Sequence, residues 1–293
     1  MADMILLPFT NFYFFGNLLA YTSLLSLSGL GIFIAYRAGV FNLGGEGQIY
    51  LGGFLGTIAG LYLFSHTPIF ISKIGLFFIS FLAGGMLAVI SGYLKYFFKV
   101  SEFISTFLIS EIVIIFVNVV LRSHFQDPEY GITSTLPLPK TLLFKKILSP
   151  SILSLGIFIS IILVIFMAYL LKNTIFGYEI RIFGFSPLFA FYGGIDIKRQ
   201  IFIPLFISGG ILGFTGMMSI LARDGRFIQG FSYGLGWDGI VISLICRGNP
   251  FWIIPGALFL SYLKVIFQIG GIYALFPIEI GHLVRALIFL LLT

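Results

Sequence analysis

The sequence predicts an all-α polytopic membrane protein, a bundle of about eight transmembrane helices (range 8–10) forming one transmembrane domain over residues 1–293. Hydrophobic residues make up 59% of the chain and charged residues only 10%, whereas a soluble domain carries about a quarter of its residues as charged groups. The mean hydropathy is +1.09. At about 20 residues for each crossing, a chain of this length holds roughly eight crossings and short loops.

The crossings are expected to be helices because the apolar runs are continuous. In hydrocarbon every backbone amide must be bonded within the element, which leaves helices or closed barrels. Barrel strands alternate apolar and polar residues over about ten positions. Runs of spanning length lie at Phe12–Ala35, Ile74–Leu94, Phe103–Leu121, Ile152–Leu171 and Ile201–Ala222. Shorter or interrupted runs, where we expect discontinuous or re-entrant helices, lie at Ile49–Phe64, Ile240–Cys246, Phe251–Phe267 and Leu283–Leu292.

Two polar stretches are long enough to form substantial loops between spans. Arg122–Ser149 is rich in turn residues, and Lys172–Arg199 mixes charges, glycines and an apolar centre. One span separates them, so they must lie on opposite sides of the membrane. Lysine and arginine are similarly frequent in both, so the positive-inside rule leaves the orientation open.

An internal echo links the two halves of the chain. Leu43-Gly-Gly-Glu-Gly47 and Leu235-Gly-Trp-Asp-Gly239 share a pattern of Leu-Gly-x-acid-Gly, and a short apolar run follows each. Paired, glycine-interrupted segments of this kind indicate structural repeats with broken helices beside a transport path. In a chain with 35 glycines, two five-residue matches can also arise by chance.

The sequence lacks the patterns typical of enzymes, metal sites and nucleic-acid binders. It has no Gly-x-Ser-x-Gly elbow, no His-Glu-x-x-His site and no phosphate loop, so no catalytic residue is assigned and any ATP must bind to another subunit. His66, His124 and His282 are far apart, and the single Cys246 offers neither a metal cluster nor an intrachain disulfide. The net charge is +6, but the basic residues are scattered singly between apolar runs. A nucleic-acid-binding surface would need them clustered.

Four acidic residues lie in or beside strongly apolar sequence: Glu46, Glu111, Asp238 and Glu279. A carboxylate is costly in lipid, so such groups face a bundle interior or a watery cavity. Glu111 and Asn118 are seven residues apart and share one helical face, where they either bond between helices or contact a solute. Glu46 and Asp238 stand among glycines, so they either cap helix N-termini, where the dipole favours an anion, or line a path.

The segment Thr174–Ile195 predicts a short exposed helix between two spans. Ser186 and Pro187 suit its N-cap and first position, and Gly193-Gly194 suits its end. An exposed short helix of this kind is suited to dock into the groove of a partner.

Four stretches give the chain a resemblance to the permease subunits of bacterial ABC importers for nucleosides and simple sugars, a group that includes ribose and branched-chain amino-acid permeases. Ala38–Gly56 resembles the Gly-x-Phe-Asn-Ile-Gly-x-Glu-Gly-Gln motif, and Glu102–Arg122 resembles the Glu-Val-Ile-Thr-Thr-Ile-Met-Leu-Asn-Tyr helix. Thr174–Ile195 resembles the coupling-helix loop, and Gly234–Phe259 the Gly-x-Gly-x-Asp-Gly-Ile region. The chain departs from the pattern at Ser110-Glu111, where Asn-Tyr is usual, and at Cys246-Arg247, where Gly is common.

The resemblance implies a multi-pass permease of the bacterial inner membrane with no cofactor of its own. It implies a cytoplasmic loop at 172–199 and an extracytoplasmic loop at 122–149. The implied partners are an ATPase subunit that binds the ATP, a second permease subunit, an extracytoplasmic substrate-binding lipoprotein and the lipid bilayer, without nucleic acid. The expected substrate is a purine or other nucleoside, with ribose- or galactose-type sugars as the alternative. An ion-coupled secondary transporter is the rival from another class.

Two sets of functional residues are expected, the first from the resemblance and the second because polar groups in apolar surroundings need partners or water. The residues expected to couple to the ATPase are Arg181, Gly184, Ser186, Pro187, Ala190, Gly193, Gly194 and Ile195. The residues expected to surround the translocation path are Asn42, Glu46, Gln48, Glu111, Asn118 and Asp238.

Overall fold

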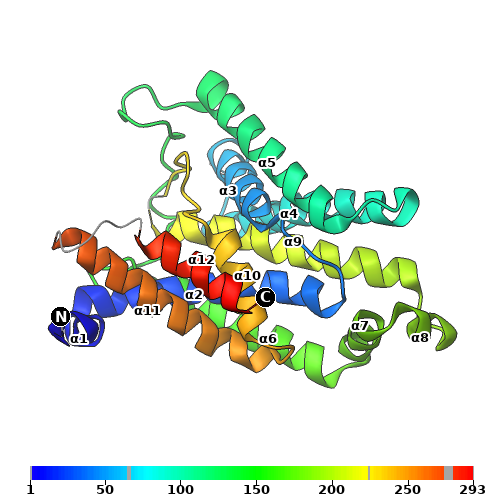
Figure 1. The fold of residues 1–293 in the computed structure, drawn as a ribbon. Helices are drawn as coiled ribbons and strands as arrows, with labels where there is room; N and C mark the ends of the chain where they lie inside the picture. The colour runs from blue at the N-terminus through cyan, green and yellow to red at the C-terminus, as the bar shows by residue number, and fades with distance from the viewer. Residues whose placement is uncertain (1, 65–66, 224, 274–279, 293) are drawn as a thin grey trace.

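The computed structural model describes residues 2–64, 67–223, 225–273 and 280–292. In Figure 1 the long helices run across the picture, and the short helix α8 (Pro187–Tyr192) lies at the far right-hand end of the molecule. We call this end the α8 end. Glu279 and His66 lie outside the described residues.

Six helices in the described part of the chain are long and apolar enough to cross a bilayer. They are α2 (Phe12–Arg37), α4 (Ile69–Phe98), α5 with the π-helical turn η1 (Glu102–Phe125), α6 (Gly156–Asn173), α9 (Ile197–Ala222), and η2 with α11 (Pro250–Ile272). The remaining helices are shorter: α1 (Ala2–Thr10), α3 (Gly45–Tyr62), α7 (Ile175–Phe185), α8, α10 (Leu235–Ile245) and α12 (Ile280–Leu292). The prediction of a polytopic helical bundle is confirmed, with six continuous spans supplemented by shorter apolar helices.

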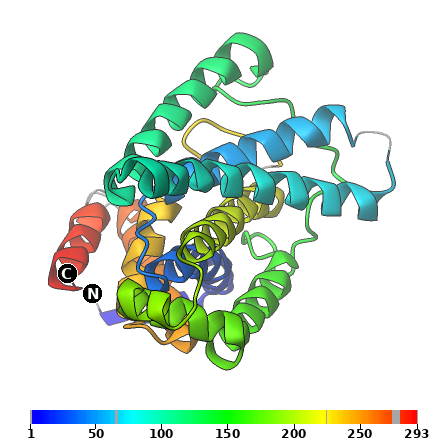
Figure 2. The same ribbon diagram turned by 90° about the vertical axis from the view of Figure 1, so that its right-hand side faces the viewer.

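The helices α2 and α9 form the centre of the bundle. In the most apolar part of each helix, 83% of the residues of α2 and 72% of those of α9 are buried. The corresponding shares are 28% for α5 and 33% for α6. In Figure 2, α2 and α9 lie near the centre and are seen nearly end-on, whereas α3, α4 and α5 run across the view beside them. The outer helices carry exposed apolar side chains such as Phe78, Ile112 and Ile162, as expected of surfaces that face lipid or another membrane subunit.

Glycines bring the backbones of α3, α4 and α9 into direct contact. A Cβ atom added to Gly213 of α9 would collide with the carbonyl oxygen of Ser80 on α4, and one added to Gly52 of α3 would collide with the Cα atom of Gly213. A Cβ on Gly84 of α4 would meet the carbonyl oxygen of Gly209. Small residues at such crossings are how membrane helices gain close van der Waals packing.

Two of the shorter helices start inside the bundle and leave in opposite directions. The first residue of α3, Gly45, lies against Gly236 in the first turn of α10, because a Cβ on Gly45 would be 3.3 Å from the Gly236 Cα atom. The far end of α3 reaches Phe125 at the end opposite α8, where Tyr62 and Phe125 pack with ring centroids 6.0 Å apart. The chain beyond α10 returns toward the α8 end, since a Cβ on Gly248 would be 2.7 Å from Arg37 Nη1 at the end of α2.

The two stretches predicted as loops are both well structured. The segment after η1 lies along the chain that follows α9, with Thr135 donating its amide to the Phe227 carbonyl at 2.9 Å and Leu138 donating to Gly225 at 2.7 Å. In the described part of the chain, the segment after η1 and the segment after α9 form an isolated β-bridge between Ser134 and Ile228 but no β-strand. The second stretch holds two helices, α7 and α8, where one was predicted. The additional helix α7 begins because the Thr174 hydroxyl accepts the Gly177 amide at 3.3 Å as an N-cap.

Candidate functional site

The starts of α3 and α10 face each other across the Glu46 side chain. Glu46 lies in the first turn of α3, and its Oε1 and Oε2 atoms accept the backbone amides of Gly234 (3.1 Å) and Gly236 (2.7 Å). Gly234 is the N-cap of α10 and has a φ of +77°, a left-handed conformation that favours glycine. The carboxylate therefore caps α10 while it also lies at the positive dipole end of its own helix.

Asp238 is the counterpart of Glu46 in the second motif, and it lies in the first turn of α10. Its Oδ2 atom is 2.7 Å from Nζ of Lys264 on α11, and the two side chains are only 4% and 17% exposed. The predicted echo thus places one carboxylate in the first turn of each half-helix. A buried carboxylate needs such a partner, because removing a charge from water costs several kcal/mol.

Asn42 and Gln48 form a reciprocal amide pair at the turn that leads into α3. Asn42 Nδ2 donates to Gln48 Oε1, and Gln48 Nε2 donates to Asn42 Oδ1, both at 2.9 Å. Asn42 also donates to the Ser208 hydroxyl of α9 at 2.8 Å. Both amide side chains are buried, so this pair fastens the turn before α3 to the central helix α9.

Asn118 and Glu111 share a helix but have different surroundings. The Tyr50 hydroxyl donates to Asn118 Oδ1 at 2.7 Å and accepts the Gly230 amide at 2.9 Å. Asn118 is thereby linked through α3 to the segment before α10. Glu111 is half-buried on α5, and it forms neither a hydrogen bond nor an ion pair with another residue that the structure describes.

The structure therefore brings Glu46 and Asp238 to one junction and links Asn42 with Gln48. It leaves Glu111 apart. None of the six predicted path residues lines either of the two large cavities formed by the described residues. Their role along a translocation path remains a prediction, and the hydrogen bonds reported above show what each of them does in this conformation.

At the α8 end, α7 is held between two other elements. The guanidinium of Arg181 donates to the carbonyls of Leu171 and Lys172, the latter at 3.2 Å. These carbonyls belong to the last turn of α6, where a cation is favoured by the helix dipole. Gly184 lies against Gly39 (φ +66°), because a Cβ on Gly39 would be 3.0 Å from the Gly184 Cα atom.

Helix α8 begins and ends where the sequence predicts. The Ser186 hydroxyl accepts the Phe189 amide at 3.3 Å as N-cap, and Pro187 is the first helical residue. The helix ends at Gly193 and Gly194, the latter with a φ of +80°, and the Ile195 amide returns to the Ala190 carbonyl at 2.9 Å.

The exposed face of α8 is apolar, and Ala190 is not part of it. Ala190 is fully buried within the chain, so it packs α8 onto the bundle. The side chains open to a partner are Leu188, Phe189, Phe191 and Tyr192, which are 59–81% exposed.

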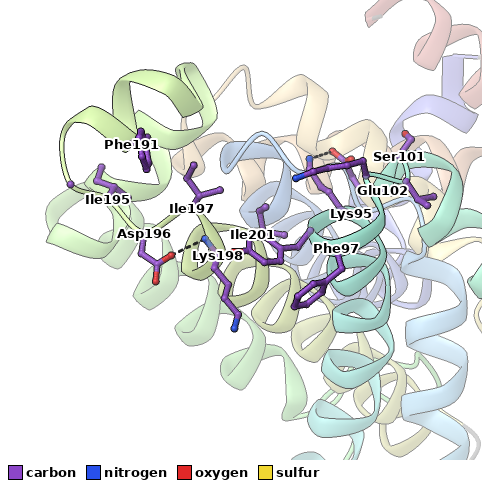
Figure 3. A pocket seen from close by; sticks show the side chains of 14 residues that line it. Lys95, Phe97, Ser101, Glu102, Phe191, Ile195, Asp196, Ile197, Lys198 and Ile201 are labelled. Atoms are coloured by element: carbon purple, nitrogen blue, oxygen red, sulfur yellow. Dashed lines mark hydrogen bonds and ion pairs between the residues drawn. The ribbon is translucent and has the colours of Figure 1, made fainter.

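A cleft of about 1010 Å³ opens beside α8. Figure 3 shows one wall formed by the turn between α4 and α5 and the other by the chain that links α8 to α9. On the first wall Lys95 pairs with Glu102 at 2.6 Å. On the second, Asp196 caps α9 by accepting the Lys198 amide at 2.8 Å. The cleft and the apolar face of α8 form one continuous surface at this end of the molecule.

Sequence reasoning missed the residues that partner the predicted ones. Lys264, Tyr50 and Ser208 each bond to a predicted path residue. Only Lys264 carried a readable signal, because it is a single charge inside the apolar run Phe251–Phe267, and intramembrane charges usually have a partner.

A comparison with protein families identifies the chain. The family model described as "Branched-chain amino acid transport system / permease component" matches residues 14–293. The chain belongs to this permease family. The resemblance seen in the sequence is therefore confirmed, and the chain is the permease subunit of an ABC importer, a multi-pass protein of the bacterial inner membrane. This assignment decides against the ion-coupled alternative.

Curated relatives cover most of the permease. A probable riboflavin import permease protein of Treponema pallidum is 26% identical over the whole of this chain and 78% of its own length. The guanosine ABC transporter permease protein NupP of Bacillus subtilis is 28% identical over 96% of this chain and 81% of its own. The nucleoside ABC transporter permease protein NupB of Lactococcus lactis is 26% identical over 82% of this chain and 68% of its own. No solved structure matches the permease.

Proposed function

We propose that the permease imports a solute in which a planar nitrogenous ring carries a hydroxylated five-carbon group, with a purine nucleoside as the first candidate. The support is that relatives named for guanosine, nucleosides and riboflavin share this chemistry. A simple sugar is the second candidate, because a glucose ABC transporter permease protein of Haloferax volcanii is 24% identical over 92% of this chain.

Competition uptake separates these candidates. Cells that express the complete importer take up labelled guanosine in the presence of excess adenosine, uridine, riboflavin, ribose or glucose. A nucleoside importer is expected to take up less labelled guanosine when adenosine or uridine is present. Competition by riboflavin tests whether a planar ring with a hydroxylated five-carbon group is sufficient for recognition. If ribose or glucose competes best, the solute is a sugar and the first candidate is wrong.

For the partners we propose that an ATPase subunit, which binds the ATP, docks on the exposed face of α8. The support is the line of large apolar side chains that a six-residue helix presents at the end of the molecule, a surface suited to a groove in a partner. In this proposal the permease has no ATPase site of its own, pairs with a second permease subunit, and receives solute from a substrate-binding protein at the opposite end. The α8 end then faces the cytoplasm.

The mechanism follows from this arrangement. ATP binding and hydrolysis in the partner displace α8, and α9 passes the displacement to the centre of the bundle. The junction of α3 and α10 lies there, so access to the middle of the membrane alternates between the two faces.

Leu188 and Ala190 provide a paired test of the docking face. Leu188→Arg places a charge on the exposed face, so it is expected to leave the permease folded while it abolishes copurification of the ATPase and solute-dependent ATP hydrolysis. Ala190→Arg inserts bulk at a fully buried position and is expected to reduce the yield of folded protein. The control is Ile132→Arg in the segment after η1, which is also exposed but lies outside the spans at the end opposite α8, and is expected to keep ATPase copurification. If the Leu188→Arg permease still binds its ATPase and transports normally, the docking assignment is wrong.

A further inference from the structure

An apolar groove of about 1050 Å³ runs between α6 and the pair α4 and α9. It is open because α6 packs mainly against α2 and α7 rather than against α9. Figure 2 shows α6 set apart from α4 in the view along the bundle. Its lining includes Phe77, Phe81, Leu163, Ile207 and Phe214, and apart from Lys73 and Thr174 it consists of apolar side chains.

Lys73 lies at the end of the groove farthest from α8. Helix α4 has 30 residues and is therefore about 45 Å long at 1.5 Å per residue, longer than the ~30 Å hydrocarbon core. Its ends accordingly reach the headgroup layers, and Lys73 is one turn inside the first residue, Ile69. The lysine stem can lie along the groove while its ammonium reaches the interface.

The ammonium of Lys73 has an aromatic neighbour and no carboxylate partner in the described part of the chain. Its Nζ lies 5.0 Å from the centre of the Phe144 ring, and among the described residues it forms no ion pair. None of the described residues that line the groove is acidic. The two residues that follow Phe144, Lys145 and Lys146, are exposed lysines. The groove thus combines a hydrocarbon-lined channel with a basic entrance at the level of the headgroups.

We propose that this groove binds one phospholipid with a net negative headgroup, such as phosphatidylglycerol. The phosphate pairs with Lys73 at the membrane surface, and an acyl chain lies between α6 and the α4–α9 pair. A polar occupant would lose its hydrogen bonds to water among these side chains, so the groove selects hydrocarbon. The Lys73 cation selects the headgroup, because a zwitterionic lipid would bring a second ammonium to an already basic entrance. This inference depends on the membrane location of the chain and is independent of its solute.

The other end of the groove reaches the start of α7. Thr174, the N-cap of α7, and Phe176 both line it. A lipid whose phosphate pairs with Lys73 belongs to one leaflet, about half of the ~30 Å hydrocarbon core, so its acyl chain occupies the half of the groove nearest Lys73.

Lipid retention tests the proposal on the full-length permease complex. The complex is reconstituted into nanodiscs with equal amounts of phosphatidylglycerol and phosphatidylcholine. It is then extracted in mild detergent, and native mass spectrometry measures the mass of the complex with its retained lipids. Wild type is expected to retain one phosphatidylglycerol per permease in preference to phosphatidylcholine. Lys73→Gln is expected to lower that preference about fivefold, the effect of one lysine near a membrane surface. Lys73→Arg restores it. Lys99→Gln is the matched control, since Lys99 also lies over an aromatic ring, that of Tyr96 at 5.9 Å, at the other end of α4.

A second variant addresses the channel itself. Ile207→Trp is designed to fill the groove and to reduce retention of both lipids while Lys73 stays in place. Size-exclusion chromatography and thermal unfolding establish that each variant is folded. Equal retention of the two lipids by wild type would overturn the proposal, and so would a Lys73→Gln complex with wild-type retention. Loss of the permease pair in the Ile207→Trp variant, without loss of lipid, would show instead that a second permease subunit occupies the groove.

Discussion

The Glu46 carboxylate accepts the Gly236 backbone amide at 2.7 Å, and this contact joins the first turns of two half-helices that leave the junction in opposite directions. Glycine is required at position 236 because a Cβ there would collide with the Glu46 backbone nitrogen. The Leu-Gly-x-acid-Gly echo therefore has a structural meaning. Its acidic residues both lie in a first helical turn, Glu46 as the second residue of α3 and Asp238 as the fourth residue of α10, and the glycines allow the two starts to approach.

Replacing Glu46 with glutamine tests whether its main role is that of a cap. Glutamine keeps one acceptor but turns its NH₂ group toward a second backbone donor. We expect a loss of about 1 kcal/mol in the free energy of unfolding, measured by denaturant titration, and a larger loss for Glu46→Ala. The order in which nucleosides and sugars compete for the remaining transport is expected to stay unchanged. A changed order with unchanged stability would place Glu46 on the solute path instead.

The buried pair of Asp238 and Lys264 is expected to show strong coupling. Lys264→Gln alone removes the cation of this ion pair while the carboxylate stays at a site that is 4% exposed, so it is expected to cost roughly 3 to 5 kcal/mol. The double change Asp238→Asn with Lys264→Gln removes both charges and is expected to cost much less than the sum of the single changes. A double-mutant cycle measures this difference. Additive single effects would mean that the ion pair contributes no coupling energy.

The orientation of the chain can be tested with two single cysteines. Glu129 lies in the segment after η1 and Lys198 lies beside the cleft near α8, and both are exposed. The native Cys246 is buried, so its background labelling is low. With a membrane-impermeant maleimide, Glu129→Cys is expected to react in intact cells and Lys198→Cys only after the membrane is opened. The reverse pattern would invert the proposed topology.

The glycine crossing of α4 and α9 is expected to tolerate no side chain. Gly213→Val would drive two methyl groups into the Ser80 backbone, so the helices must separate, at a cost of about 1 to 3 kcal/mol. Met86→Val changes a side chain on α4 that is 62% exposed and is the control, with an expected effect within about 0.5 kcal/mol. Equal unfolding midpoints for the two variants would show that the crossing is loosely packed.

The features that could be predicted from the sequence are those encoded locally. Ser186, Pro187 and Gly194 predicted both ends of α8 because capping and left-handed backbone depend on residues within one turn. The apolar runs predicted the continuous spans for a similar reason, since length and composition decide whether a helix can cross the membrane.

The features that escaped prediction depend on contacts distant in sequence. Glu46 and Gly236 are separated by 190 positions, and the echo showed that the two motifs were related without showing that they touch. Ala190 was predicted as a docking residue, but a helix of six residues has too few turns to reveal which face it buries. The structure shows that its neighbours Leu188 and Phe189 are the exposed ones.

The direct backbone contacts among α3, α4 and α9 also bear on how a displacement of α8 would be transmitted through the bundle. Three backbones in direct contact bury little side-chain volume between them, so under the mechanism proposed above α3, α4 and α9 are expected to move together. Only four residues separate α8 from α9, so a movement of α8 would act directly on the nearest end of α9. If the ATPase docks on α8 as proposed, a displacement of α8 is therefore expected to reach the first turn of α3 in the middle of the membrane.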